Sequence, residues 1–167
     1  MEMLTEASIE YVKNQVKSGI DCFQLFETYS GIISNEDYKN FILPLSTKIL
    51  IEARESGVPT IFFPKNFNEG LKYINKEMCD YVSVDYDISL DHARNLLDSE
   101  VGIQGNMDPK IFYQEIDEIE NYLKSLIGFG SKNTDWIFNL GHGFRPDIDH
   151  IKVKYVVEWI KNANWKR

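Results

Sequence analysis

The chain alternates between segments with a helical spacing of apolar residues and short, continuous apolar runs. Apolar residues three or four positions apart predict amphipathic helices, whereas short apolar runs bounded by turn residues predict buried strands. Five runs of the second kind occur, and each is followed by a helical segment. These predicted strands are IDCFQLFE (20–27), VPTIFFP (58–64), YVSVDY (81–86), VGIQGN (101–106) and WIFNL (136–140).

The predicted helices have recognisable boundaries. A first helix presents an apolar face from Ile9 to Val16 and ends near Gly19. A longer helix begins at Ser34, which stands three residues before an acidic residue as in a capping box, and Pro44 is expected to kink it before it ends near residue 57. Further helices are predicted for residues 68–78, for 90–97 with Ser89 as the cap, for 109–128 with Pro109 in first position, and for 153–160.

Apolar strands without polar alternation suit a parallel sheet that is covered on both faces. The repeated strand–helix unit therefore predicts an α/β fold, either a doubly wound sheet or part of a (β/α) barrel, and periodicity alone does not choose between them. No internal repeat or linker interrupts the 167 residues, so residues 1–167 are expected to form one domain.

Composition narrows the classes of partner and compartment. The net charge of −8 argues against nucleic acid or an anionic membrane as the main partner. The N-terminal residues are charged and amphipathic, and no apolar stretch approaches membrane-spanning length, so we expect a cytoplasmic protein. Cys22 and Cys79 lie far apart within or beside apolar runs, which predicts two buried, reduced thiols.

Polar side chains follow every predicted strand. In both candidate architectures the ligand site lies at the C-terminal ends of the parallel strands. The residues there are Glu27, Thr28 and Tyr29; Lys65 and Asn66; Asp85 and Tyr86; Gln104, Gly105 and Asn106; and Asn139, Gly141, His142, Gly143 and Arg145.

Each of these residues also has a purely structural interpretation. His142, between two glycines, is either a hydrogen-bonding turn residue or part of a site. Thr28 could cap the next turn, and Asp85 could orient a neighbouring loop instead of contacting a ligand. Lys65 and Arg145 could be solvated loop charges.

Five blocks carry a resemblance to a known family. In order along the chain they are QLFETYSG (24–31), TIFFPK (60–65), VSVDY (82–86), GIQGNMDP (102–109) and FNLGHGFRPD (138–147). Together they closely resemble the C-terminal half of the uroporphyrinogen decarboxylase family. The resemblance implies the C-terminal part of a (β/α)8 TIM barrel, about five βα units. It also implies cofactor-free removal of carbon dioxide from the acetate side chains of uroporphyrinogen, a tetrapyrrole, which gives coproporphyrinogen for haem and porphyrin biosynthesis.

The resemblance also implies roles for particular residues. His142 matches the family's histidine at the pocket mouth, and Phe26 matches a phenylalanine that lines the pocket. Thr28 stands where the family often has a serine, and Lys65 matches a basic position, although the next residue, Asn66, begins a stretch that replaces the usual glycines. The candidate site is therefore His142 for catalysis and, for substrate binding, Phe26, Thr28, Lys65, Asp85, Asn106 and Arg145, with no metal.

The family's N-terminal arginines, aspartate and tyrosine have no counterpart in these 167 residues. Five strands cannot close an eight-stranded barrel, so the chain alone is expected to be inactive or nearly so.

Three hypotheses about the function of the chain follow. The chain is a decarboxylase half that works with an N-terminal-half chain or in a homodimer, or it is a non-catalytic remnant or porphyrin-binding module. The third, a corrinoid-linked methyltransferase of the same superfamily, has the least support because it needs zinc held by histidine and cysteine, and the cysteines lack such spacing.

Overall fold

A computed structural model describes residues 1–165 and shows one parallel sheet of five strands in that part of the chain. All five predicted strands are confirmed to within a few residues. The strands are β1 (Phe23–Glu27), β2 (Thr60–Pro64), β3 (Tyr81–Ser83), β4 (Gly102–Met107) and β5 (Trp136–Leu140), and they pair in the order β1-β2-β3-β4-β5. The α/β prediction is therefore confirmed.

The strand order and the curvature of the sheet identify part of a barrel. A doubly wound sheet reverses its strand order at a switch point, whereas a barrel adds each strand beside the previous one. The Gln24 Oε1 atom on β1 lies 3.5 Å from the Gln104 Nε2 atom on β4. In a flat sheet the backbones of two strands three positions apart would lie about 14 Å from each other. The sheet is therefore curled, and both glutamines lie on its concave face.

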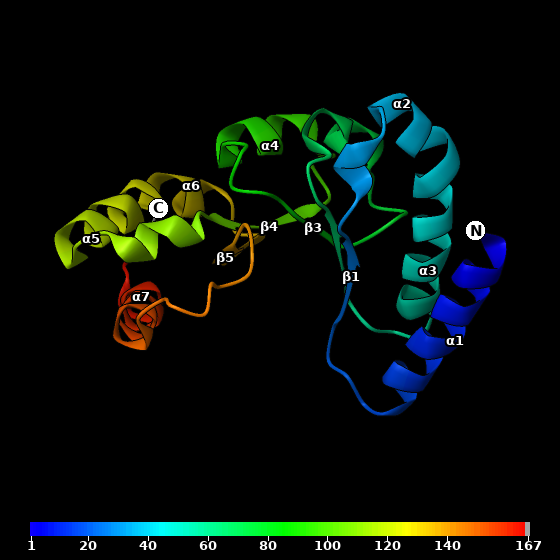
Figure 1. Ribbon diagram of the computed structural model, residues 1–167, viewed down its shortest axis with the longest axis horizontal. Helices are drawn as coiled ribbons and strands as arrows, with labels where there is room; N and C mark the ends of the chain where they lie inside the picture. Colours follow the sequence, from blue (N-terminus) through cyan, green and yellow to red (C-terminus); the bar gives the residue numbers. More distant parts are fainter. Residues whose placement is uncertain (166–167) are drawn as a thin grey trace.

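The described helices lie along the convex side of the sheet. Figure 1 shows them as an arc that runs from α1 and α3 past α4 to α5, α6 and α7. The concave side would be filled by side chains in a closed barrel, which explains why the strands are apolar on both faces without helices on both. The helices are α1 (Glu2–Lys17), α2 (Asn35–Asp37), α3 (Leu43–Glu55), α4 (Leu90–Leu96), α5 (Ile116–Ser125), α6 (Ile127–Lys132) and α7 (His150–Asn162).

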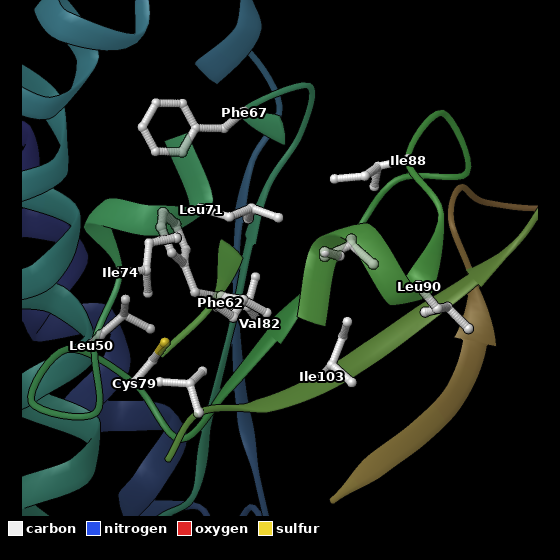
Figure 2. Close-up of a cluster of buried hydrophobic side chains, with 14 of the residues drawn as sticks. Leu50, Phe62, Phe67, Leu71, Ile74, Cys79, Val82, Ile88, Leu90 and Ile103 are labelled. Carbon is white, nitrogen blue, oxygen red and sulfur yellow. The ribbon is translucent and has the colours of Figure 1, made fainter. Parts of the chain in front are cut away.

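The hydrophobic core lies between this convex face and the helices. Phe62, Val82 and Ile103, from three neighbouring strands, are completely buried. Figure 2 shows them in one cluster with Leu50 of α3 and Leu90 of α4. Burying an aliphatic or phenyl side chain stabilises a fold by roughly 1.5–3 kcal/mol, so this layer holds the strands in their curved arrangement.

The long helix predicted from Ser34 to residue 57 is divided in the structure. The Ser34 hydroxyl accepts the N–H of Asp37, which confirms the predicted cap. A π-helical turn over Tyr38–Ile42 then leads into α3, and Pro44 is the second residue of α3. A proline is tolerated there because the first N–H groups of a helix have no intrahelical acceptor.

Two other predicted helices were wrong in extent. Residues 68–78 form only a short 3-10 helix over Asn68–Tyr73. Residues 109–128 contain a 3-10 helix over Pro109–Tyr113, followed by α5 and then α6, which continues past the predicted end. Glu115 and Glu118 form a capping box that starts α5 as a new helix, and this local signal was missed.

The cysteine prediction is only half right. Cys79 is buried, but Cys22, just before β1, is exposed, and both are free thiols. The exposure follows from its position, because β1 is an edge strand of the described sheet. Among the described helices, none is long and apolar enough to cross a membrane.

Candidate functional site

The candidate site lies at the C-terminal edge of the sheet. All strand pairs are parallel, so their C-terminal ends share one edge. The predicted residues Thr28, Lys65, Asp85 and His142 follow β1, β2, β3 and β5, and Asn106 lies near the end of β4. The fold thus collects at one edge polar side chains that are separated by up to 114 positions in the sequence.

Lys65 and His142 approach each other across the curved sheet. The Lys65 Nζ atom lies 3.4 Å from the His142 Nε2 atom, although β2 and β5 are separated by two strands. The other ring nitrogen, Nδ1, lies 3.4 Å from the carbonyl oxygen of Gly143. An ammonium group only donates, so these contacts fit an imidazole with its proton on Nδ1 and its Nε2 lone pair toward Lys65.

Asp85 interacts electrostatically with both Lys65 and His142 and is only 3% exposed. Its Oδ2 atom accepts the backbone N–H of Asn66 at 2.5 Å. Burial raises the pKa of the Asp85 carboxyl, while the Asn66 N–H and the positive charge of Lys65 act in the opposite direction. The structure therefore places the Asp85 side chain against a loop backbone. Of the two roles that the sequence left open, this contact supports orientation of a neighbouring loop.

Ser30 is a member of this edge that the sequence interpretation missed. It is 1% exposed, and its Oγ atom lies 3.0 Å from the Glu27 carbonyl oxygen and 2.5 Å from the Lys65 carbonyl oxygen. The predicted residue Thr28 is exposed and does not cap the next helix, since Tyr29 is the N-cap residue of the 3-10 helix Ser30–Ile32. The hydrogen bond from Ser30 to the Lys65 carbonyl oxygen exists because the ends of β1 and β2 lie side by side, and no local sequence pattern predicts it.

An aromatic wall lies beside the polar edge. The Phe26 side chain is 64% exposed and packs edge to face on Phe63, with 6.0 Å between ring centroids. The two residues are partners in the register of β1 and β2. Ile137 of β5, partner of Gln104, adds an exposed apolar side chain to the same concave face. Phe63 was missed because an uninterrupted apolar run does not show which face each residue occupies.

Asn106 and Arg145 have different environments. Asn106 is buried, and its side-chain amide donates to the carbonyl oxygens of Asp85 at 2.6 Å and Ile88 at 2.5 Å. Both amide protons are therefore used to hold the loop after β3. Arg145 is exposed and helps to line a hollow of about 210 Å³ together with His142 and Lys110.

The arrangement is suited to binding a carboxylate that is attached to a flat, apolar body. The Lys65 ammonium provides donors for the acid, the His142 imidazole lies beside it, and the exposed rings provide an apolar surface. Within residues 1–165, no group of three or more histidine, cysteine, aspartate or glutamate residues is placed to hold a metal ion.

Comparisons with known proteins agree with this geometry. The family model for uroporphyrinogen decarboxylase matches residues 1–163. The uroporphyrinogen decarboxylase of Vesicomyosocius okutanii is 34% identical over 159 residues, which cover 94% of this chain and 46% of that protein. Proteins of the same name from Chlorobium luteolum and Geobacter sulfurreducens are 36% and 30% identical, over 94% and 99% of this chain and 46% and 49% of their own lengths. The chain thus spans about half the length of the curated relatives it matches.

Proposed function

The chain belongs to the uroporphyrinogen decarboxylase family. On that premise we propose that it forms one side of an active site that decarboxylates uroporphyrinogen, the side that the C-terminal half of the family contributes. The product is coproporphyrinogen, formed by loss of carbon dioxide from the acetate side chains. The observation that carries this proposal is the 3.4 Å approach of Lys65 to His142 at the mouth of a curved sheet, with Phe26 exposed on the same side.

The residue types fit the chemistry of the reaction. Protonation of a pyrrole carbon next to the acetate creates an electron sink in the ring. The carbon–carbon bond to the carboxylate then breaks, its electrons flow into that sink, and carbon dioxide leaves. The methylene carbon left behind takes up a proton and the ring carbon gives up the proton it had gained, so that the acetate becomes a methyl group and the pyrrole is restored. In this proposal the Lys65 ammonium binds a substrate carboxylate, and the His142 imidazole takes up or gives up a proton during the reaction. Phe26 excludes water from that carboxylate, which weakens its solvation and favours its loss.

The five-stranded sheet has exposed edges that a further protein segment could cover. The outer edges of β1 and β5 have no strand partner within residues 1–165, and Phe26 and Ile137 of the concave face are exposed. Unpaired edges and exposed apolar side chains are features that further strands would cover. We therefore propose that a segment equivalent to the unmatched half of the relatives completes the barrel, and that turnover depends on it. A homodimer that covers the same edges is the alternative.

The test is reconstitution. The chain is co-expressed with the unmatched half of the Vesicomyosocius okutanii relative, and coproporphyrinogen formed from uroporphyrinogen is measured. Product is expected from the pair and not from either part alone. Soluble, associated halves without product would reject the decarboxylase proposal. If such a pair still bound the tetrapyrrole, the porphyrin-binding module would be the correct alternative.

His142 is tested in the reconstituted pair. Loss of a residue that transfers a proton or holds the reacting carboxylate lowers turnover by roughly 100-fold or more, so we expect about that loss for His142→Asn, with an unchanged melting temperature. The matched control is His150→Asn, because the His150 side chain is 93% exposed at the start of α7. Equal turnover in the two variants would restrict His142 to a structural role.

A further inference from the structure

We propose that Asp85 is a positioning residue that holds the Lys65 side chain over His142 by clamping one peptide group. Its catalytic consequence rests on the proposed decarboxylase function, but the positioning itself does not.

The clamp acts on the peptide group that joins Lys65 to Asn66. The carbonyl oxygen of this peptide lies 2.5 Å from the Ser30 hydroxyl, which comes from the end of β1. The N–H of the same peptide donates to the Asp85 carboxylate at 2.5 Å, from the end of β3. One peptide plane is therefore held at both of its polar ends by the segments that follow β1 and β3, the two neighbours of β2. Because a peptide is planar, this fixes the two backbone dihedrals that flank it.

The backbone at this turn needs such support. Asn66 has a φ of +60°, in the left-handed region that few residues other than glycine adopt readily, although asparagine is among the more tolerant. The neighbouring chain also closes tightly on it, since a Cβ atom added to Gly31 would lie 2.3 Å from the Cβ of Asn66. Without the Asp85 and Ser30 contacts, other conformations of the turn become accessible.

The orientation of the turn decides where Lys65 points. A lysine side chain has four rotatable bonds, so it occupies one place only when its Cα–Cβ direction is fixed and its ammonium has a partner. The clamp fixes that direction, and His142 is the partner at 3.4 Å. The negative charge of Asp85 lies close enough to interact with both Lys65 and His142. Asp85 thus acts on the pair through backbone geometry and through charge, while its own side chain is buried.

Asp80 provides a matched control. It also ties β2 to the segment at β3 through a backbone N–H, because its Oδ2 atom accepts the N–H of Thr60 at 2.9 Å. It lies at the opposite, N-terminal end of these strands, directly before β3. Its replacement should weaken the same strand pair without changing the geometry at His142.

The experiment measures the imidazole ¹⁵N resonances of His142 in the chain as it exists. Lys65→Met defines the shift caused by losing the ammonium at Nε2. Asp85→Ala should reproduce at least half of that shift, and Asp85→Asn should recover part of the parent position because an amide oxygen can still accept the Asn66 N–H. Asp80→Ala should leave the resonances in place while it lowers the melting temperature.

Unchanged His142 resonances in folded Asp85→Ala would overturn the proposal and leave Asp85 a stabilising residue only. If Asp85→Ala does not fold, Ser30→Ala decides, because it releases the other end of the same peptide and should shift His142 in the same direction. No shift in Ser30→Ala would then overturn the proposal.

In the reconstituted enzyme, Asp85→Ala should raise KM about tenfold and change kcat less. Absence of turnover in the parent pair would reject the decarboxylase proposal, yet the resonance test would stand.

Discussion

Gly141 offers a sharp test of how closely the strand ends approach. It directly follows β5 and packs against the backbone after β3. A Cβ atom at this position would lie 2.3 Å from the backbone nitrogen of Tyr86 and 2.8 Å from the carbonyl carbon of Asp85. Both are main-chain atoms, so no side-chain rotation can relieve the overlap. In Gly141→Ala, the end of β5 must move away from the end of β3.

The size of the effect follows from these distances. Carbon atoms in ordinary contact lie about 3.5–4.0 Å apart, so the two segments must separate by roughly 1 Å or more. Overpacking of a well-packed interior costs typically about 1–3 kcal/mol. Because two backbone segments must move, we expect Gly141→Ala to lower the free energy of unfolding by about 3 kcal/mol. The same movement should carry His142 away from Lys65.

Urea denaturation followed by circular dichroism measures this difference. Gly143→Ala is the matched control, two residues further along the same loop, because an added Cβ there has no atom within 4 Å. It should change the free energy of unfolding by no more than about 0.5 kcal/mol. If Gly141→Ala were as stable as the parent protein, β5 and the segment after β3 would not approach each other this closely.

Two further predictions concern single side chains. Cys22 is exposed, whereas Cys79 is 0% exposed and burial raises its pKa to about 12. Burial also raises the pKa of the Cys22 thiol, but its exposure leaves it accessible. A thiol reagent at pH 8 should therefore modify Cys22 in the folded protein and Cys79 only on unfolding; equal rates for both would contradict the packing. Burial of Asp80 disfavours its charge, but hydrogen bonds from Lys76 and Thr60 outweigh this and lower the pKa of its carboxyl. Since the folded-state pKa is lowered, the ionised carboxylate stabilises the fold above the ordinary aspartate pKa of about 3.9, and this contribution is lost as the pH falls through the lowered value. The difference in unfolding free energy between the parent and Asp80→Asn should be largest at pH 7 and smallest near pH 3, and a constant difference across this range would refute the reasoning.

Helix boundaries show where local patterns fall short. The cap at Ser34 was predicted because it depends on a residue three positions away. The break before α5 was missed even though Glu115 and Glu118 form a local signal, since the apolar spacing from Ile116 onward continued the expected periodicity. Cys22 was misplaced for another reason: its exposure depends on whether a strand lies beside β1, which no local pattern reports.

By itself, the sequence determined the five strands, their polar C-terminal ends and the family resemblance, because burial periodicity and short motifs are local properties of a chain. Only the tertiary structure decided that the strands are neighbours in sequential order, which face of each is concave, and which polar residues meet. Lys65 contacts His142, and Ser30 and Asp85 hold the same peptide, because the curled sheet brings the ends of strands from different parts of the chain together. Contacts of that kind depend on sheet curvature, and curvature arises from packing between distant segments.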